Sequence, residues 1–170
     1  CRGSLTDGDR VDVRTYVGPW ARGPVTAALL REHYRGGQSV VVVPRISDLP
    51  DIEDFFKKHA PELTYVVAHG QMPPATVEER MSAFYDRNYD VLLATTIVES
   101  GLDIPSANTL IIHRADRFGL AQLYQLRGRV GRSKTRAYAY MVTPKDRVIT
   151  EKAEKRLKIL GDLDSLGAGL

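Results

Sequence analysis

The sequence is nearly devoid of cysteine and contains no long apolar run. A single cysteine, Cys1, stands among 170 residues, which excludes an internal disulfide framework and a cysteine-rich zinc site. No stretch approaches the roughly 18 consecutive apolar residues that span a bilayer, and the first residues are polar, unlike a signal peptide. We therefore expect a soluble protein of a reducing compartment, with the cytoplasm as the default.

The usual loops that hold a nucleotide are also missing. The sequence has neither a Gly-x-x-x-x-Gly-Lys-Ser/Thr phosphate loop nor a Gly-x-Gly-x-x-Gly motif after the first predicted strand. Any nucleotide chemistry must therefore be shared with another domain. The net charge of +3, from 24 basic and 21 acidic residues, permits binding to nucleic acid but is too small an excess to argue for it.

Short β-branched runs alternate with amphipathic stretches along most of the chain. Strands are predicted at 11–17, 39–43, 64–68, 90–95, 109–113 and 137–142, and helices near 24, through 52–56, and at 76–85, 120–128 and 150–160. Near-continuous apolar strands such as 40–43 are typical of a parallel sheet that is buried on both faces. We predict an α/β fold: a mostly parallel central sheet with helices on both faces, in three layers.

The length predicts one domain with two short flanking segments. Residues 1–10 are rich in Gly, Ser, Asp and Arg, which is typical of a linker or an expression remnant. Residues 11–148 form the predicted domain, and 149–170 a helical extension. In a parallel sheet, ligands bind beyond the carboxyl ends of the strands, so functional residues are expected in those loops.

The segment Gln125-Leu126-Arg127-Gly128-Arg129-Val130-Gly131-Arg132 is the strongest candidate for chemistry. A glycine weakens a helix by about 1 kcal/mol, so Gly128 and Gly131 indicate that something approaches closely. Arg129 and Arg132 lie three positions apart, and we expect them to share a helical face. Because guanidinium groups fit phosphate oxygens, the pattern favours arginines that complete a phosphoryl-transfer site over a solvated basic turn.

The stretch 94–105 follows a predicted strand directly. The hydroxyls and backbone amides of Thr95 and Thr96 are candidates for gripping a DNA phosphate without reading sequence. Gly101 would permit a turn that brings Asp103 toward a ribose hydroxyl. Threonines that cap a helix and an aspartate that closes a turn are an equally ordinary explanation of this stretch taken alone.

Weaker candidates stand at two other strand ends. His69 and Gly70 are candidates for holding a second phosphate of the same DNA strand, and Arg45 for another, although a surface role for Arg45 is equally open. His69 has no partner at metal-ligand spacing, so no metal site is predicted. Supporting roles are assigned to Glu99, Gln125 and Arg127. A charged loop expected to position the arginine segment consists of Arg114, Asp116 and Arg117.

These segments resemble motifs of the superfamily 2 helicases. The stretches 94–105 and 125–132 resemble motifs V and VI, while 40–45 and 69–72 resemble motifs IV and IVa. The string Ala-Asp-Arg-Phe-Gly-Leu-Ala-Gln-Leu-Tyr-Gln-Leu-Arg-Gly-Arg-Val-Gly-Arg-Ser at 115–133 is similar to the group that contains the transcription-repair coupling factor and the branched-DNA helicase RecG. Residues 95–105, 69–72 and 166–170 are closer to the coupling factor.

The resemblance implies the second RecA-like lobe of a bacterial, cytoplasmic, ATP-dependent translocase on double-stranded DNA. Arg129 and Arg132 would then reach ATP, which with Mg²⁺ is held mainly by a first RecA-like lobe absent from this sequence, and Gly101 and Asp103 would serve the nucleotide side. Such a protein displaces stalled RNA polymerase and recruits an excision-repair protein, so that transcription is coupled to nucleotide excision repair. The isolated lobe is expected to be inactive, and 150–160, with Arg156, to lead toward a translocation motif.

Three alternatives remain at this point. The chain is also compatible with a lobe of a RecG-like branched-DNA helicase. A second alternative is a non-catalytic module that binds nucleic acid or protein, in which the arginines matter only for salt-dependent affinity. A dinucleotide-dependent oxidoreductase would suit the sheet but lacks the glycine motif.

Overall fold

Six strands alternate with helices along the chain. The structure is a computed structural model, and it describes residues 13–95, 107–130, 136–145 and 148–169, apart from the side chains of 163–169. The elements in order are β1 (Val13–Pro19), α2 (Arg22–Tyr34), β2 (Gln38–Val42), η1 (Ile46–Asp48), α3 (Leu49–His59), β3 (Tyr65–Ala68), α4 (Pro74–Tyr85), β4 (Val91–Ala94), β5 (Ala107–His113), η3 (Ala115–Arg117), α5 (Leu120–Arg127), β6 (Ala137–Thr143) and α6 (Glu151–Gly169).

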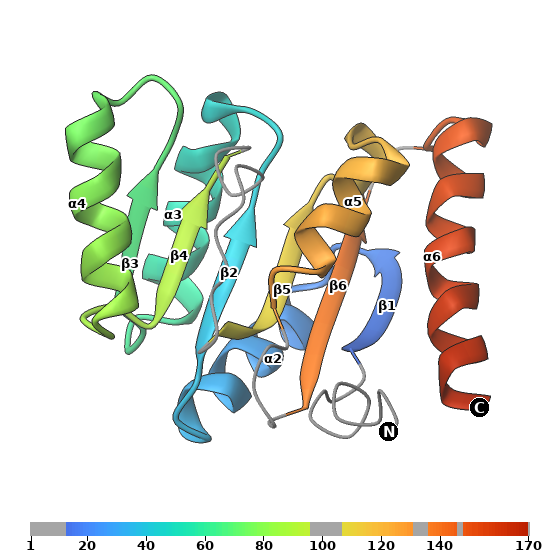
Figure 1. The fold of residues 1–170 in the computed structure, drawn as a ribbon, viewed down its shortest axis with the longest axis horizontal. Helices are drawn as coiled ribbons and strands as arrows, with labels where there is room; N and C mark the ends of the chain where they lie inside the picture. Colours follow the sequence, from blue (N-terminus) through green and yellow to red (C-terminus); the bar gives the residue numbers. More distant parts are fainter. Residues whose placement is uncertain (1–12, 96–106, 131–135, 146–147, 170) are drawn as a thin grey trace, which may run out of the picture.

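The strands form one sheet in the order β1-β6-β5-β2-β4-β3, and all five pairings are parallel. Every residue of β2 and β4 is buried, as the continuous valine and leucine runs predicted. The predicted parallel sheet is therefore confirmed. Because the strands run in one direction, their carboxyl ends all lie along one edge, and this edge carries the loops expected to be functional (Figure 1).

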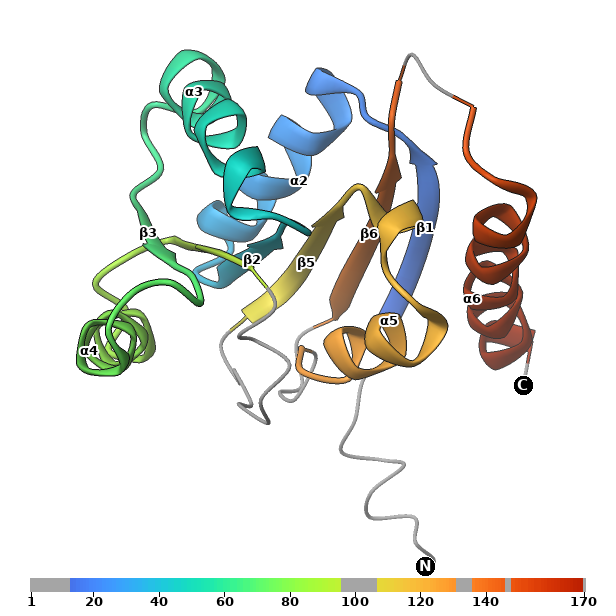
Figure 2. The ribbon, with the colours of Figure 1, turned by 90° about the horizontal axis from the view of Figure 1, so that it is seen from above.

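Helices cover both faces of the sheet, as predicted. Helices α2 and α3 lie on one face, α4 and α5 lie on the other, and α6 runs beside β1 (Figure 2). The core is correspondingly divided in two. One part packs Leu29, Ile52 and Phe56 against the sheet, and the other packs Phe84, Leu123 and Leu157 against the opposite face.

Local sequence explains where several helices begin and end. Helix α3 has a proline in its first turn and Lys57, Lys58 and His59 in its last, which suits the dipole of the helix. The chain leaves α2 through Gly36, whose φ of 83° is a conformation that favours glycine. Among the described helices, none combines the length and apolarity that crossing a membrane requires.

Most element boundaries differ from the sequence predictions by a few residues, and two of the differences concern α6 and α5. Helix α6 continues to Gly169, beyond the predicted end at 160. Helix α5 ends at Arg127, and Gly128 is its C-cap. The second difference changes the interpretation of the arginine segment.

Candidate functional site at the carboxyl edge of the sheet

The carboxyl edge brings together side chains that are distant in sequence. Arg45 follows β2, His69 follows β3, Thr95 follows β4 and Arg114 follows β5. Since these strands are parallel neighbours, the four loops emerge at the same edge (Figure 1). Thr96, Glu99, Gly101, Asp103 and Arg132 lie outside the described residues.

Thr95 is built into the sheet edge. Its side chain and backbone are 5% exposed, and its amide donates to the carbonyl of Ala68 across 3.3 Å. That amide is consequently engaged within the sheet and cannot also serve as the exposed phosphate donor suggested by the sequence. A contact between Thr95 and DNA would have to use the hydroxyl.

His69 begins a tight turn that leads toward α4. The amide of Gln71 donates to its Nδ1 across 3.2 Å, and the amide of Met72 donates to its carbonyl across 3.2 Å. With Nδ1 accepting, the neutral ring carries its proton on Nε2, which is then the atom able to donate to a phosphate oxygen. Gly70 is exposed, and a Cβ added there would meet no atom within 4 Å, so space for a ligand exists beside it.

Arg45 is paired only loosely. Its side chain is 52% exposed, and its guanidinium lies 3.4 Å from a carboxylate oxygen of Asp48. Its amide also donates to Asp48 across 3.1 Å, which caps η1. An exposed ion pair of this kind contributes little to stability, so a phosphate can replace the carboxylate at low cost.

The loop after β5 is held from two sides. Arg114 adopts a left-handed backbone with φ of 56°, and its guanidinium donates two bonds to Asp116, of 2.9 and 3.1 Å. The hydrogen bond to Asp116 raises the pKa of Arg114, so the guanidinium stays charged. Arg156, from α6, donates to the carbonyls of Asp116 at 3.0 Å and Phe118 at 3.2 Å. The charged loop thus links the start of α5 to α6.

Helix α5 carries the start of the arginine segment. The amide of Gly119 donates to the side chain of Gln122 across 2.9 Å, which caps the helix, while Leu123 and Leu126 anchor it in the core. Arg127 donates to the hydroxyl of Thr15 across 2.8 Å and to the carbonyl of Val13 across 3.2 Å. Arg127 therefore fixes the helix to β1.

Arg129 lies beyond the helix. Its amide donates to the carbonyl of Leu126 across 3.1 Å in a turn, and the side chain is half-buried. The expectation that Arg129 occupies a helical face shared with Arg132 is wrong for this residue, because α5 ends two residues earlier. A Cβ on Gly128 would lie 3.4 Å from the carbonyl oxygen of Tyr124, which is an ordinary van der Waals contact, and its backbone is right-handed helical, so the geometry of this exit does not itself require glycine.

Sequence patterns missed two neighbours of this edge. His113 is the last residue of β5, and its ring lies edge-on to Trp20, with centroids 5.5 Å apart. Burial lowers the pKa of His113, so its ring is neutral at physiological pH. Neither residue belongs to a recognisable motif; the only available indication was that each follows or ends an apolar strand. Among the described residues, no group of three His, Cys, Asp or Glu side chains is arranged to hold a metal ion.

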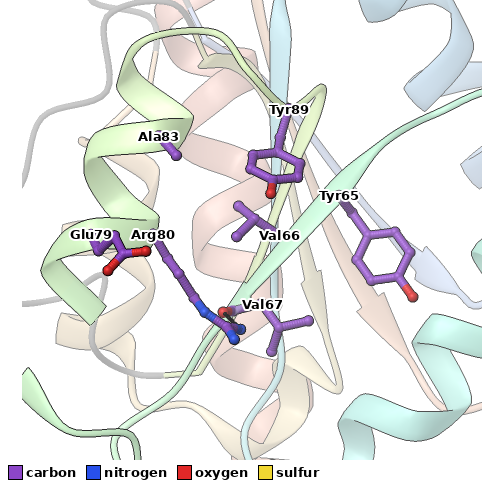
Figure 3. A pocket seen from close by; sticks show the side chains of 7 residues that line it. All are labelled: Tyr65, Val66, Val67, Glu79, Arg80, Ala83 and Tyr89. Atoms are coloured by element: carbon purple, nitrogen blue, oxygen red, sulfur yellow. Dashed lines mark hydrogen bonds between the residues drawn. The ribbon is translucent and has the colours of Figure 1, made fainter. Parts of the chain in front are cut away.

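A separate pocket of about 400 Å³ lies between β3 and α4 (Figure 3). Arg80 reaches from α4 and donates to the carbonyl of Val67 across 2.8 Å, which covers part of this outer strand. Burial raises the pKa of Tyr65 to about 12, assisted by its hydrogen bond to Glu53. Of the residues predicted to bind ATP or DNA, those that the structure describes do not line this pocket.

Comparison with known proteins defines the class. Residues 24–134, more than half of the chain, match the helicase conserved C-terminal domain, and the chain belongs to that family. It is similar to the transcription-repair-coupling factors of Rickettsia prowazekii (52% identity over 161 residues), Myxococcus xanthus (51% over 161) and Haemophilus influenzae (46% over 160). These alignments cover 94–95% of this chain but only 13–14% of the relatives, so the chain spans about a seventh of their length.

Solved structures agree with this assignment. RecG bound to a three-way DNA junction superposes with a TM-score of 0.76 at 33% identity, over 91% of this chain and 22% of RecG. The C-terminal domain of the DEAD-box protein Dbp5 superposes with a TM-score of 0.62 at 17% identity, over 88% of this chain and 86% of that domain. The predicted RecA-like helicase fold is confirmed.

Proposed function

We propose that the chain is the second motor lobe of an ATP-dependent translocase on double-stranded DNA of the coupling-factor kind. The observation that carries the proposal is the identity of 46–52% to coupling factors over almost the whole chain. In addition, the stretches that resemble motifs IV, IVa and V come at the carboxyl ends of neighbouring parallel strands. RecG, the alternative, is 33% identical, which favours the coupling factor.

ATP hydrolysis in this proposal is shared between two lobes. The sequence contains no phosphate loop, so Mg²⁺ and the triphosphate would be bound mainly by the first lobe. Arg129 would reach across with Arg132 to the transferring phosphoryl group, where fixed positive charge lowers the barrier. The turn after α5 suits this task because Leu123 and Leu126 hold the helix rigidly in the core, and Arg129 lies directly beyond its C-cap, Gly128. Gly101 and Asp103 are assigned to the nucleotide side.

DNA would be held by phosphate contacts along the carboxyl edge. Arg45, His69, Gly70 and Thr95, with Thr96, are assigned to one strand of the duplex. Such contacts position a motor without reading sequence, which suits movement along DNA. The proposed partners of the whole protein are double-stranded DNA, the first RecA-like lobe, RNA polymerase and the excision-repair recruitment protein, in the bacterial cytoplasm.

A chimera tests the proposed function. The chain would replace the matching lobe in the coupling factor of Myxococcus xanthus, and release of RNA polymerase stalled on a DNA template would be measured by gel shift. We expect ATP-dependent release by the chimera and none by the same chimera carrying Arg129→Ala. A well-folded chimera that hydrolyses ATP on duplex DNA but never releases polymerase would contradict the coupling assignment; one that does neither would contradict the motor assignment.

A further inference from the structure

One face of the sheet is left uncovered at β1 and β6. Helix α2 contacts β2 and β5, and no described helix lies over β1 and β6 on the same side (Figure 2). On this face Tyr16 of β1 pairs in register with Tyr140 of β6, and Arg14 pairs with Tyr138. Tyr16 remains 47% exposed, although large apolar rings are normally covered.

The tyrosines of this face form an ordered stack. The ring of Tyr16 lies 5.1 Å from that of Tyr140, with 15° between their planes, and 6.4 Å from that of Tyr138. The guanidinium of Arg31 sits 4.4 Å above the ring of Tyr138 and donates to the hydroxyl of Tyr140 across 2.7 Å. We call this set the tyrosine–arginine face: Arg14, Tyr16, Arg31, Tyr138 and Tyr140. The three tyrosines and Arg31 are held by these contacts, so a partner that binds there loses little entropy in ordering them.

The charge of the region has one sign. Helix α2 and strands β1 and β6 contain one acidic residue, Glu32, and it is 1% exposed. Glu32 is neutralised by Arg35, whose guanidinium lies 2.6 Å away, and it accepts a bond from Thr109. The exposed charges that remain on these elements are Arg14, Arg22 and Arg31, so the surface attracts an acidic partner.

An apolar groove opens beside this face. It has a volume of about 210 Å³ and lies between the start of α2 and the ends of β1 and β6. Its walls include Tyr16, Gly18, Pro24, Val25 and Tyr140. A groove of this size accepts one leucine- or phenylalanine-sized side chain, and the described residues assigned to ATP or DNA, such as Arg45, His69 and Arg129, do not line it.

We propose that the tyrosine–arginine face and its groove bind an acidic protein segment that inserts one large apolar side chain into the groove. Tyrosine and arginine are the residues that contribute most at protein interfaces, and arginine beside an apolar pocket suits acidic residues flanking an apolar anchor. A nucleic-acid strand fits less well, because bases need open aromatic faces, and these rings already stack on one another and on Arg31.

A labelled peptide tests this surface. The probe is a fluorescein-labelled peptide of Asp and Glu residues around one central Phe, and its binding to the 170-residue chain is followed by fluorescence anisotropy. The variant Gly18→Leu places a side chain in the groove, because Gly18 is one of its lining residues. A Cβ at this position meets no atom within 4 Å, so we expect the fold to tolerate the substitution. We expect Gly18→Leu, and replacement of the central Phe by Ala, each to weaken binding about ten-fold.

Charge is tested separately from the groove. Arg31→Glu is expected to weaken binding about ten-fold, whereas Lys57→Glu, the same charge change at an exposed site on α3, leaves it within two-fold. The proposal is overturned if the peptide shows no saturable binding at millimolar concentration. It is equally overturned if Lys57→Glu weakens peptide binding as much as Arg31→Glu does, or if Gly18→Leu leaves peptide affinity unchanged. Two further outcomes would assign the surface to another occupant. If single-stranded DNA binds with the same dependence on Gly18 and Arg31, the surface binds nucleic acid; if Gly18→Leu abolishes self-association of the chain in sedimentation, the surface binds a second copy of the chain.

Discussion

Arg127 and Arg129, at and just beyond the end of α5, have different environments despite their close spacing. Arg127 is bonded to β1 and fixes the helix, whereas Arg129 lies in the turn beyond it. The sequence predicted a helix over 120–128, yet the spacing of the arginines also placed Arg129 on a helical face, and these two expectations conflict once Gly128 is the C-cap. For Thr95, the position after β4 was predicted, but its burial and its bond to Ala68 depend on the neighbouring strand.

His113 should make the stability of the fold depend on pH. Burial lowers the pKa of His113 below the ordinary value of 6.5. Below about pH 6.5, His113 is therefore protonated in the unfolded chain but still neutral in the folded chain. The free energy of unfolding consequently falls as the pH drops from about 6.5 through the folded pKa of His113. Trp20, the single tryptophan, reports the site because its ring lies against that of His113.

The measurement is a pH titration of Trp20 fluorescence, together with urea unfolding at several pH values. We expect a fluorescence midpoint below 6.5 that is absent in His113→Gln, and a shallower pH dependence of unfolding for that variant. A midpoint at or above 6.5 in the unmodified chain would show that burial does not control this histidine.

At the scale of elements, nearly all strands and helices could be predicted, since apolar β-branched runs and amphipathic stretches are local properties. The order of the strands within the sheet could not be predicted from the sequence. Strand β1 lies next to β6, at the opposite end of the chain, and the Tyr16–Tyr140 stack exists only because of this pairing. The groove and the uncovered face therefore have no signature in the sequence.

Helix α6 provides an element-scale prediction through Arg156. Its bonds to the carbonyls of Asp116 and Phe118 hold α6 against the loop that precedes α5. Because Arg156→Ala leaves those carbonyls without this partner, we expect the free energy of unfolding to fall by about 1–2 kcal/mol and the amides of α6 to exchange faster.

Urea unfolding followed by circular dichroism, with hydrogen exchange of α6, measures both effects. The matched control is Lys158→Ala, an exposed position on the same helix, which should change stability by less than about 0.5 kcal/mol. If the two variants are indistinguishable, Arg156 does not couple α6 to the loop.

At the scale of the whole molecule, we propose that the chain supplies one wall of an ATP site that a first lobe completes. It belongs to the helicase C-terminal family, it has no phosphate loop, and it spans about a seventh of its coupling-factor relatives. The candidate DNA residues Arg45, His69 and Thr95 follow strands of the parallel sheet and Arg129 follows α5, whereas the tyrosine–arginine face is formed by different residues. This division would let one lobe contact nucleotide, DNA and a protein partner at once.

The most direct test of the account is the steady-state ATPase activity of the chain fused to a first lobe that carries a phosphate loop, measured with and without duplex DNA. We predict DNA-stimulated turnover that falls about 10³-fold in Arg129→Ala, with duplex affinity unchanged, because the arginine acts on the transferring phosphoryl group. Arg22→Ala, an exposed arginine at the start of α2, should retain full turnover. Turnover in Arg129→Ala within ten-fold of the unmodified fusion would contradict the assignment of this chain as a motor lobe.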